Sequence, residues 1–92
     1  MTLSRKPLVL LVEDEADIRQ ISALALKLDG WDVQEAINGR EALRLMRQRM
    51  PDLLISDVMM PEMSGLELCR RLIEDLKRSD IPVLLTSAIN EQ

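Results

Sequence analysis

The sequence predicts an α/β fold, in which helices cover both faces of a doubly wound parallel sheet. Short apolar runs alternate with amphipathic stretches in the order β-α-β-α-β-α-β, and the first run, Leu8–Val12, is apolar at every position. A strand that is buried on both faces of a sheet requires such a continuous run. Strands joined by helical crossovers are parallel, and their connections are right-handed.

The chain begins with this central strand and a first helix. In the stretch 15–28 the apolar residues fall on one helical face, and Asp29-Gly30 provides a stop signal. We expect the inner face of this helix to consist of Ile18, Ile21, Leu24, Ala25 and Leu28. Leu26 does not fit this stripe.

A second strand and helix follow. Trp31 and Val33 alternate with polar residues, which predicts a strand with one wetter face at the edge of the sheet. Asn38-Gly39 then breaks the chain before a helix that is closed by Pro51. Its apolar residues Ala42, Leu43 and Met46 should face inward, and Arg40, Arg44 and Arg47 outward.

The second half of the chain repeats the pattern. Residues 53–56 predict a third strand that runs directly into Asp57. Ser64 and Glu67 have the spacing of a capping box and open a third helix. Its expected inner face consists of Leu66, Cys69, Leu72, Ile73 and Leu76. A fourth apolar strand, Val83–Thr86, comes last.

Length and composition limit the chain to one domain or part of one. It has 92 residues, of which 47% are hydrophobic and 30% charged, as in ordinary soluble proteins. No apolar run could span a membrane or serve as the core of a signal peptide, so we expect a cytoplasmic location. The net charge of -4 argues against direct binding to nucleic acid. The single cysteine excludes an internal disulfide.

Acidic residues follow two of the predicted strands. Glu13, Asp14 and Glu15 come directly after the first strand, and Asp57 comes after the third. Sheets of this type bind ligands at the carboxyl ends of their strands, where the strand order reverses. Neighbouring carboxylates would repel one another unless a cation lay between them. Mg²⁺ fits such a site better than Ca²⁺, because Mg²⁺ takes one or two carboxylates and keeps waters and phosphate oxygens.

A purely structural role explains the same residues. Acidic side chains favour the positive end of a helix dipole, which would account for Glu13, Asp14 and Glu15. Asp57 could be a solvated turn residue. The spacing alone leaves both interpretations open.

Taken together, the motifs resemble the receiver domain of two-component response regulators, of the chemotaxis-regulator type. The matching segments are 9–15, 53–57, 58–65 and 81–88. Each motif is weak alone, but their order and spacing are specific. The resemblance implies a flavodoxin-like receiver fold over residues 1–92, with strand order 2-1-3-4.

The same resemblance implies a site and a mechanism. Asp57 would be the phospho-acceptor, which takes a phosphoryl group from a sensor histidine kinase or a phosphotransfer protein and so switches partner interactions. Asp14 and Asp57 would bind Mg²⁺, Glu13 would bind it directly or through water, and the backbone carbonyl of Met59 would complete the protein ligands. Such a domain is not an enzyme beyond its own phosphorylation and dephosphorylation.

Two hydroxyls are candidates for the family's switch residue, which hydrogen-bonds the phosphoryl oxygen. Ser87 matches that position, and we prefer it because the small residue Ala88 follows it. Thr86 is the adjacent alternative. A hydroxyl at a strand end could instead bond local backbone.

The sequence departs from the family near its C-terminal end. The family continues to a fifth strand and helix, with a lysine that pairs with the phosphoryl group, whereas no lysine follows Lys77 here. We therefore expect that the domain is incomplete at its C-terminus and that phosphotransfer is weakened or absent. The missing C-terminal segment and an output domain would be further partners of this chain. Val83–Thr86 would become an exposed edge strand through which two chains dimerise.

Two other classes of function compete with this interpretation. A degenerate receiver would act as an interaction module without phosphorylation; the missing lysine favours it, and the retained acidic residues argue against it. An enzyme or nucleotide binder on the same plan fits poorly, because a dinucleotide or P-loop site needs glycines after the first strand. A phosphohydrolase would usually carry its aspartate after the first strand and not the third.

Overall fold

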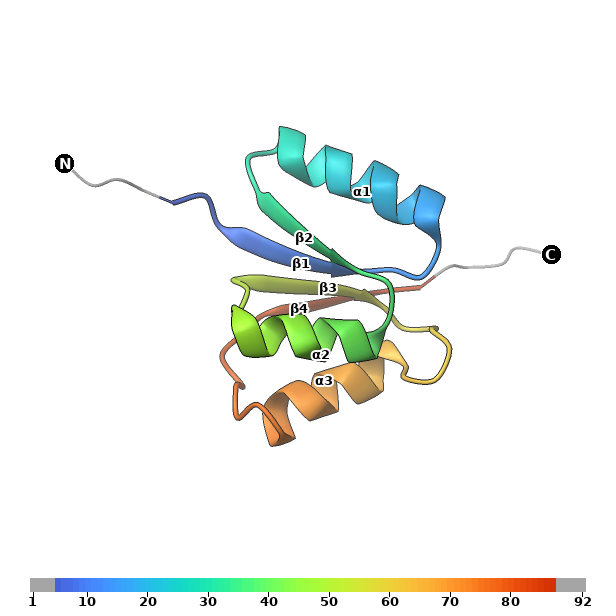
Figure 1. Cartoon of the computed structure of the whole chain (residues 1–92), viewed down its shortest axis with the longest axis vertical. Helices are drawn as coiled ribbons and strands as arrows, with labels where there is room; N and C mark the ends of the chain where they lie inside the picture. Colours follow the sequence, from blue (N-terminus) through green and yellow to red (C-terminus); the bar gives the residue numbers. More distant parts are fainter. Residues whose placement is uncertain (1–4, 88–92) are drawn as a thin grey trace.

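The computed structural model describes residues 5–87, which form a four-stranded parallel sheet with helices on both faces (Figure 1). The strand order is β2-β1-β3-β4, as predicted. α1 covers one face of the sheet, and α2 and α3 cover the other. The elements are β1 (Leu8–Val12), α1 (Ala16–Leu28), β2 (Asp32–Ala36), α2 (Gly39–Gln48), β3 (Leu53–Asp57), α3 (Gly65–Glu74) and β4 (Val83–Thr86). None of these helices is long and apolar enough to cross a membrane.

β1 is the central strand of the sheet, and all five of its residues are buried. It pairs in parallel with β2 on one side and with β3 on the other, so that Val12 lies opposite both Ala36 and Ser56. β2 is an edge strand, as its alternating pattern predicted. Because all four strands are parallel, their carboxyl ends lie along the same edge of the sheet.

The main core lies between the sheet and helices α2 and α3. Alternate residues of a strand point to opposite faces, so Leu10 and Val12 of β1 point to the same side as Leu54 of β3. The buried cluster on this side consists of Leu10, Val12, Ala36, Ala42, Leu43, Met46, Leu54, Leu68 and Leu72. This packing fixes α2 and α3 against the sheet.

Side chains cap the starts of α2 and α3. The Asn38 Oδ1 atom accepts a hydrogen bond from the Glu41 N–H at 2.8 Å, and the Glu41 carboxylate accepts one from the Ile37 N–H at 2.9 Å. In α3 the Ser64 hydroxyl accepts from the Glu67 N–H at 3.1 Å, as predicted. The Glu67 carboxylate binds arginines of α3, so it does not complete the predicted capping box.

The predicted inner face of α1 is wrong. The exposed fractions are 52% for Ile18, 70% for Ile21, 58% for Leu24 and 81% for Leu28. Ala23 is buried, and Leu26, which did not fit the predicted stripe, is partly buried. α1 rests on the sheet with the side that bears these two residues, and no second helix within residues 5–87 lies on this face to cover the stripe.

The predicted inner face of α3 is wrong in part. Leu68 and Leu72 are buried in the core, whereas Leu66 and Ile73, which the pattern placed inside, are exposed. Cys69 is partly buried and carries a free thiol. Leu72 is buried and Leu76 packs against the core, as predicted, so the apolar period of α3 identified the helix and part of its buried side but missed Leu68.

Candidate metal centre

Three carboxylates meet at the carboxyl ends of β1 and β3. Glu13 and Asp14 follow β1 directly, and Asp57 is the last residue of β3, which is the neighbour of β1 in the sheet. One carboxylate oxygen from each of these three residues lies within 4.8 Å of the others. The sequence prediction that these residues converge is therefore confirmed, and Glu15, as the residue before α1, stays outside the cluster.

The cluster carries negative charge that nearby side chains do not balance. Glu13 is 7% exposed, and this burial raises the pKa of its carboxyl above 4.5, an effect that the Glu15 N–H opposes and the charge of Asp57 strengthens. No ion pair within residues 5–87 involves Glu13, Asp14 or Asp57. Carboxylates that close repel one another unless a cation is present.

The donor set fits Mg²⁺. All three side chains offer hard oxygen atoms, and two of them are exposed or partly exposed, so waters and phosphate oxygens can complete an octahedral shell. The Glu13 Oε2 atom already accepts a hydrogen bond from the Glu15 N–H at 3.1 Å, which holds that carboxylate in place. Glu13, Asp14 and Asp57 are thus the side chains that could hold the ion.

Arg19 of α1 supports the loop that carries this cluster, and the sequence interpretation missed it. Its guanidinium donates a hydrogen bond to the backbone carbonyl of Glu13 at 2.8 Å and forms an ion pair with Glu35 of β2 at 3.3 Å. The Arg19 side chain is only 15% exposed. The sequence does show Arg19 between apolar residues of α1. Because a charge close to the sheet needs a partner, this position could have indicated the contact.

Hydrogen bonds and one close approach hold the backbone around Asp57. The buried Ser56 hydroxyl donates to the Asp57 carbonyl at 3.0 Å, and the Val58 carbonyl accepts from the Gly65 N–H at 2.9 Å. A Cβ atom on Gly65 would collide with the Asp57 carbonyl oxygen and lie 3.1 Å from its carbonyl carbon. α3 therefore starts directly against the backbone of Asp57, and a glycine is needed there for steric reasons.

The remaining predicted residues lie at the same edge of the sheet. Thr86 pairs with Asp57 in the ladder between β3 and β4, and its carbonyl accepts from the Val58 N–H at 2.7 Å. Ser87 is the next residue and is exposed. The Met59 side chain is also exposed, and its N–H donates to the Asp57 Oδ1 atom at 3.2 Å. The roles of the Ser87 hydroxyl and the Met59 carbonyl stay predictions.

The chain is similar to known proteins over most of its length. Residues 9–92 match the model of the response regulator receiver domain. The chain belongs to this family. Among solved structures, this receiver domain is similar to the chemotaxis protein CheY4 of Vibrio cholerae, with a TM-score of 0.87 and 32% identity over 95% of this chain and 72% of that one. It is also similar to a receiver domain from Methanoculleus marisnigri, with a TM-score of 0.85 and 31% identity over 94% and 70% of the two chains.

Longer proteins contain segments similar to this receiver domain. It is 42% identical over 84 residues to the phosphate regulon transcriptional regulatory protein PhoB of Pseudomonas aeruginosa. The aligned region covers 91% of this chain and 37% of that protein. It is 46% identical over 88 residues to Histidine kinase P4 of Formosa agariphila. This aligned region covers 96% of this chain and 6% of that protein. The chain therefore spans a little more than a third of the length of the first relative and a small part of the second.

Proposed function

We propose that this receiver domain accepts a phosphoryl group on Asp57 and acts as a phosphorylation-dependent switch in two-component signalling. The observation that carries the proposal is the convergence of Glu13, Asp14 and Asp57 within 4.8 Å at the edge of the sheet. A site of this kind suits a cation together with a phosphoryl group, because the group brings oxygen ligands and the cation offsets the charge of the carboxylates.

Asp57 would supply the nucleophile. Its Oδ1 atom is held by the Met59 N–H, which leaves Oδ2 to attack the phosphorus atom of a phosphohistidine. The new O–P bond forms as the P–N bond breaks, and the electron pair of the broken bond leaves with the imidazole nitrogen. Because a carboxylate is a weak nucleophile, the rate must come from positioning and from charge neutralisation.

Mg²⁺ bound by Glu13, Asp14, Asp57 and the backbone carbonyl of Met59 would neutralise charge on the transferred phosphoryl group. The protein's own contribution is to position Asp57. Ser56 and Gly65 fix its backbone on two sides, and Arg19 fixes the carbonyl of Glu13. Loss of any of these supports should weaken the site without removing a ligand.

A hydroxyl at the end of β4 would report the phosphorylation to the surface. Ser87 and Thr86 are both exposed there, and Thr86 is paired with Asp57 through the ladder. A hydrogen bond from one of them to the phosphoryl group would draw the end of β4 toward β3. We assign this role to Ser87, with Thr86 as the alternative.

The partners follow from this chemistry. A histidine kinase or a phosphotransfer protein would donate the phosphoryl group, and the relatives include both a histidine kinase and transcriptional regulators. An output domain would then read the phosphorylated state. Which response it controls depends on segments outside this chain.

The proposal is tested by intact-mass spectrometry after incubation with acetyl phosphate, with and without Mg²⁺. The expected result is one phosphoryl adduct that needs Mg²⁺ and is absent from the Asp57→Asn variant. The matched control is Asp32→Asn, because Asp32 is an exposed aspartate at the opposite end of the sheet, beside Leu8. No adduct on a chain that circular dichroism shows to be folded would instead favour an interaction module that is not phosphorylated.

A further inference from the structure

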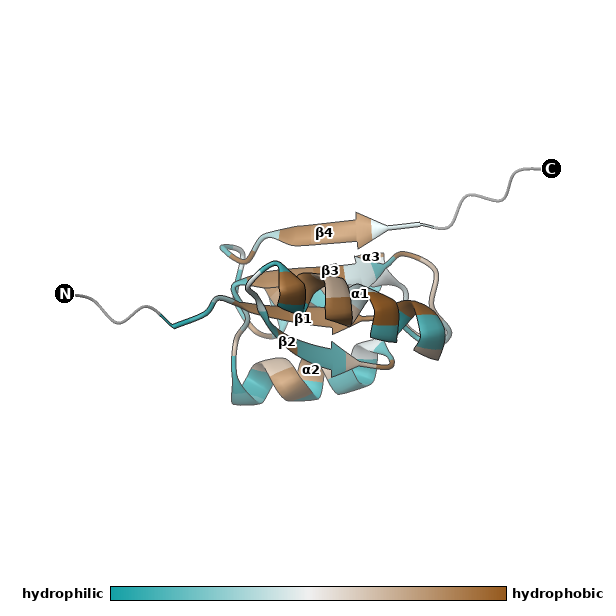
Figure 2. Ribbon diagram, turned by 90° about the horizontal axis from the view of Figure 1, so that it is seen from above, coloured by the Kyte–Doolittle hydropathy of each residue, from teal (hydrophilic) through white to brown (hydrophobic). Residues whose placement is uncertain are grey.

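The edge strand β2 stays in contact with the chain beyond the end of β1. The last paired residues of the two strands are Val12 and Ala36, and the Ala36 carbonyl also accepts a hydrogen bond from the Glu13 N–H at 3.0 Å. Figure 2 shows β2 as a hydrophilic strand beside the apolar β1. β2 therefore holds one side of the first carboxylate residue, and it offers polar side chains for further contacts.

A second contact from β2 runs through side chains. Ala36 belongs to the core under α2 and α3, so the preceding residue, Glu35, points to the face that α1 covers. There the Glu35 Oε1 atom lies 3.3 Å from the Nε atom of Arg19. The Nη1 atom of the same guanidinium donates a hydrogen bond to the Glu13 carbonyl at 2.8 Å. One arginine thus links β2 to the loop that carries the metal centre.

The Glu13 carbonyl matters because it belongs to the planar peptide group that joins Glu13 to Asp14. The direction of this carbonyl fixes the orientation of the peptide group, and with it the position from which the Asp14 side chain extends. Both backbone polar groups of Glu13 are occupied, the N–H by Ala36 and the carbonyl by Arg19. The meeting of Glu13, Asp14 and Asp57 within 4.8 Å depends on this backbone geometry.

Arg19 needs a partner in order to hold its position. Its side chain is 15% exposed, so most of its charge is removed from water, and an unpaired charge there would be costly. Glu35 supplies the opposite charge, and its own side chain is 34% exposed. A guanidinium presents its nitrogens in a rigid fork, so the contact of Nε with Glu35 also sets the direction of Nη1. Glu35 therefore determines where Arg19 points.

We propose that Glu35 is a positioning residue for the metal centre, and that it acts through Arg19 on the peptide group between Glu13 and Asp14. Glu35 itself lies outside the group of three carboxylates that could hold the ion. The inference rests on the proposed function, since it takes these three carboxylates as ligands of Mg²⁺. Side chains that orient ligands from outside change the metal affinity by about 10–100-fold.

Two other roles of the same pair predict different results. If Arg19 and Glu35 only fasten α1 to β2, their loss lowers the melting temperature and leaves the affinity for Mg²⁺ unchanged. If the charge of Arg19 acts directly on the carboxylates, its loss strengthens Mg²⁺ binding, because a cation that repels the ion is removed. Positioning predicts weaker binding when either residue is lost.

The test is isothermal titration of the 92-residue chain with Mg²⁺, at a temperature at which circular dichroism shows every variant to be folded. The variants are Glu35→Met, Glu35→Gln, Arg19→Met and the double variant Arg19→Met with Glu35→Met. Glu35→Gln removes the charge but keeps an oxygen that accepts from the Arg19 Nε atom. The matched control is Glu74→Met, because Glu74 also pairs with an arginine but is the last residue of α3, far from Gly65 and the Asp57 backbone.

Glu35→Met should bind Mg²⁺ at least about threefold more weakly than the parent chain, and Arg19→Met at least about tenfold. The double variant should bind no more weakly than Arg19→Met, because Glu35 acts through Arg19. Glu35→Gln should recover most of the loss, and Glu74→Met should bind like the parent. Losses that add in the double variant would overturn the proposal, as would tighter binding by Arg19→Met.

A second readout needs no metal. In the metal-free chain the Glu13 amide should exchange its hydrogen faster in Glu35→Met and Arg19→Met than in Glu74→Met, because the residue loses one of its two backbone contacts. If the parent binds no Mg²⁺, the proposed metal site is wrong, and the exchange rates still decide whether Glu35 positions the loop. If the parent binds Mg²⁺ and Glu35→Met binds it equally well, only the role of Glu35 is wrong.

Discussion

Replacing Gly65 by alanine should destabilise the fold and loosen the metal centre together. The added Cβ would collide with the carbonyl oxygen of Asp57 and lie 3.1 Å from both the Asp57 carbonyl carbon and a methyl group of Leu85. The main obstacle is backbone inside a ladder, so it cannot move aside as a flexible side chain could. Overpacking of this kind costs about 1–3 kcal/mol, which corresponds to a loss of roughly 5–15 °C in Tm for a chain of this size.

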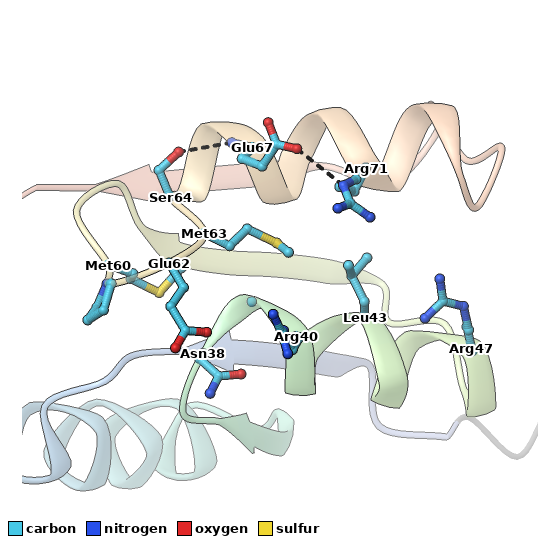
Figure 3. Close-up of a pocket in the computed structure, with 12 residues that line it drawn as sticks. Asn38, Arg40, Leu43, Arg47, Met60, Glu62, Met63, Ser64, Glu67 and Arg71 are labelled. Carbon is cyan, nitrogen blue, oxygen red and sulfur yellow. Dashed lines mark hydrogen bonds and ion pairs between the residues drawn. The ribbon is translucent and has the colours of Figure 1, made fainter.

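Gly39→Ala is the matched control, because Gly39 and Gly65 are both first residues of ten-residue helices. A Cβ on Gly39 would approach the sulfur of Met63 at 2.6 Å, and this atom lies near the end of a flexible side chain that lines the groove between α2 and α3 (Figure 3). Met63 can move aside, and alanine favours the helix over glycine by about 1 kcal/mol. We therefore expect the stability of Gly39→Ala to change by less than about 1 kcal/mol.

Thermal unfolding by circular dichroism gives the stability of both variants, and isothermal titration with Mg²⁺ gives the affinity of the metal centre. Gly65→Ala should bind Mg²⁺ at least about tenfold more weakly, because a displaced Asp57 no longer meets Glu13 and Asp14. A Gly65→Ala variant that melts like the parent chain would contradict the predicted collision with the Asp57 backbone. Equal losses of stability in both glycine variants, with unchanged Mg²⁺ affinity, would contradict it as well.

Three further perturbations address the charges. Asp57→Asn should raise the Tm of the metal-free protein, because it removes one of three mutually repelling carboxylates. In a thermal shift assay the variant should also lose most of the stabilisation by Mg²⁺. Equal stabilisation of parent and variant by Mg²⁺ would contradict this. Arg19→Met should cost about 1–3 kcal/mol in urea unfolding, whereas Arg44→Met, which loses one exposed ion pair, should cost about 0.5 kcal/mol or less. Hydrogen bonds from arginines, Arg70 first, lower the pKa of Glu67 below 4.5 in the folded state, so its contribution to stability is present above that pH and is lost as the pH falls through the folded pKa. The decline of Tm in acid should therefore be shallower in Glu67→Gln, and curves of identical slope would exclude this contribution.

Much of the fold is predictable from the sequence because buried parallel strands leave a strong local pattern. Leu8–Val12 is apolar throughout and is the central strand, and Val83–Thr86 is a strand with the predicted bounds. The faces of α1 were harder to predict. The period of a helix shows which residues share a face, but the direction of that face depends on what covers it. The apolar stripe of α1 points away from its own sheet, which no local pattern reveals.

The acidic residues of the site could be predicted because they follow the ends of strands. The side chains that hold the surrounding backbone in place could not. Glu13, Asp14 and Asp57 follow strands that prove to be neighbours, so their convergence could be inferred from order alone. The support by Arg19 depends on a contact between α1, β2 and the loop after β1, and sequence spacing does not encode such contacts. The cytoplasmic location and the incomplete single domain over residues 1–92 stay predictions.

The strand order has a consequence for how the chain folds during synthesis. β1 is made first and lies in the centre, and the sheet is extended outward from it, first by β2 on one side and then by β3 on the other. Each strand can dock on a finished surface as it leaves the ribosome, without a later strand having to be inserted between two earlier ones. Two of the three strand pairings join strands one crossover apart, and the pairing of β1 with β3 spans two, so no pairing closes a loop longer than two crossovers. β4 is the last of the four described strands to be made and lies at an edge, so it can detach, as β2 can at the other edge, while the other three remain paired.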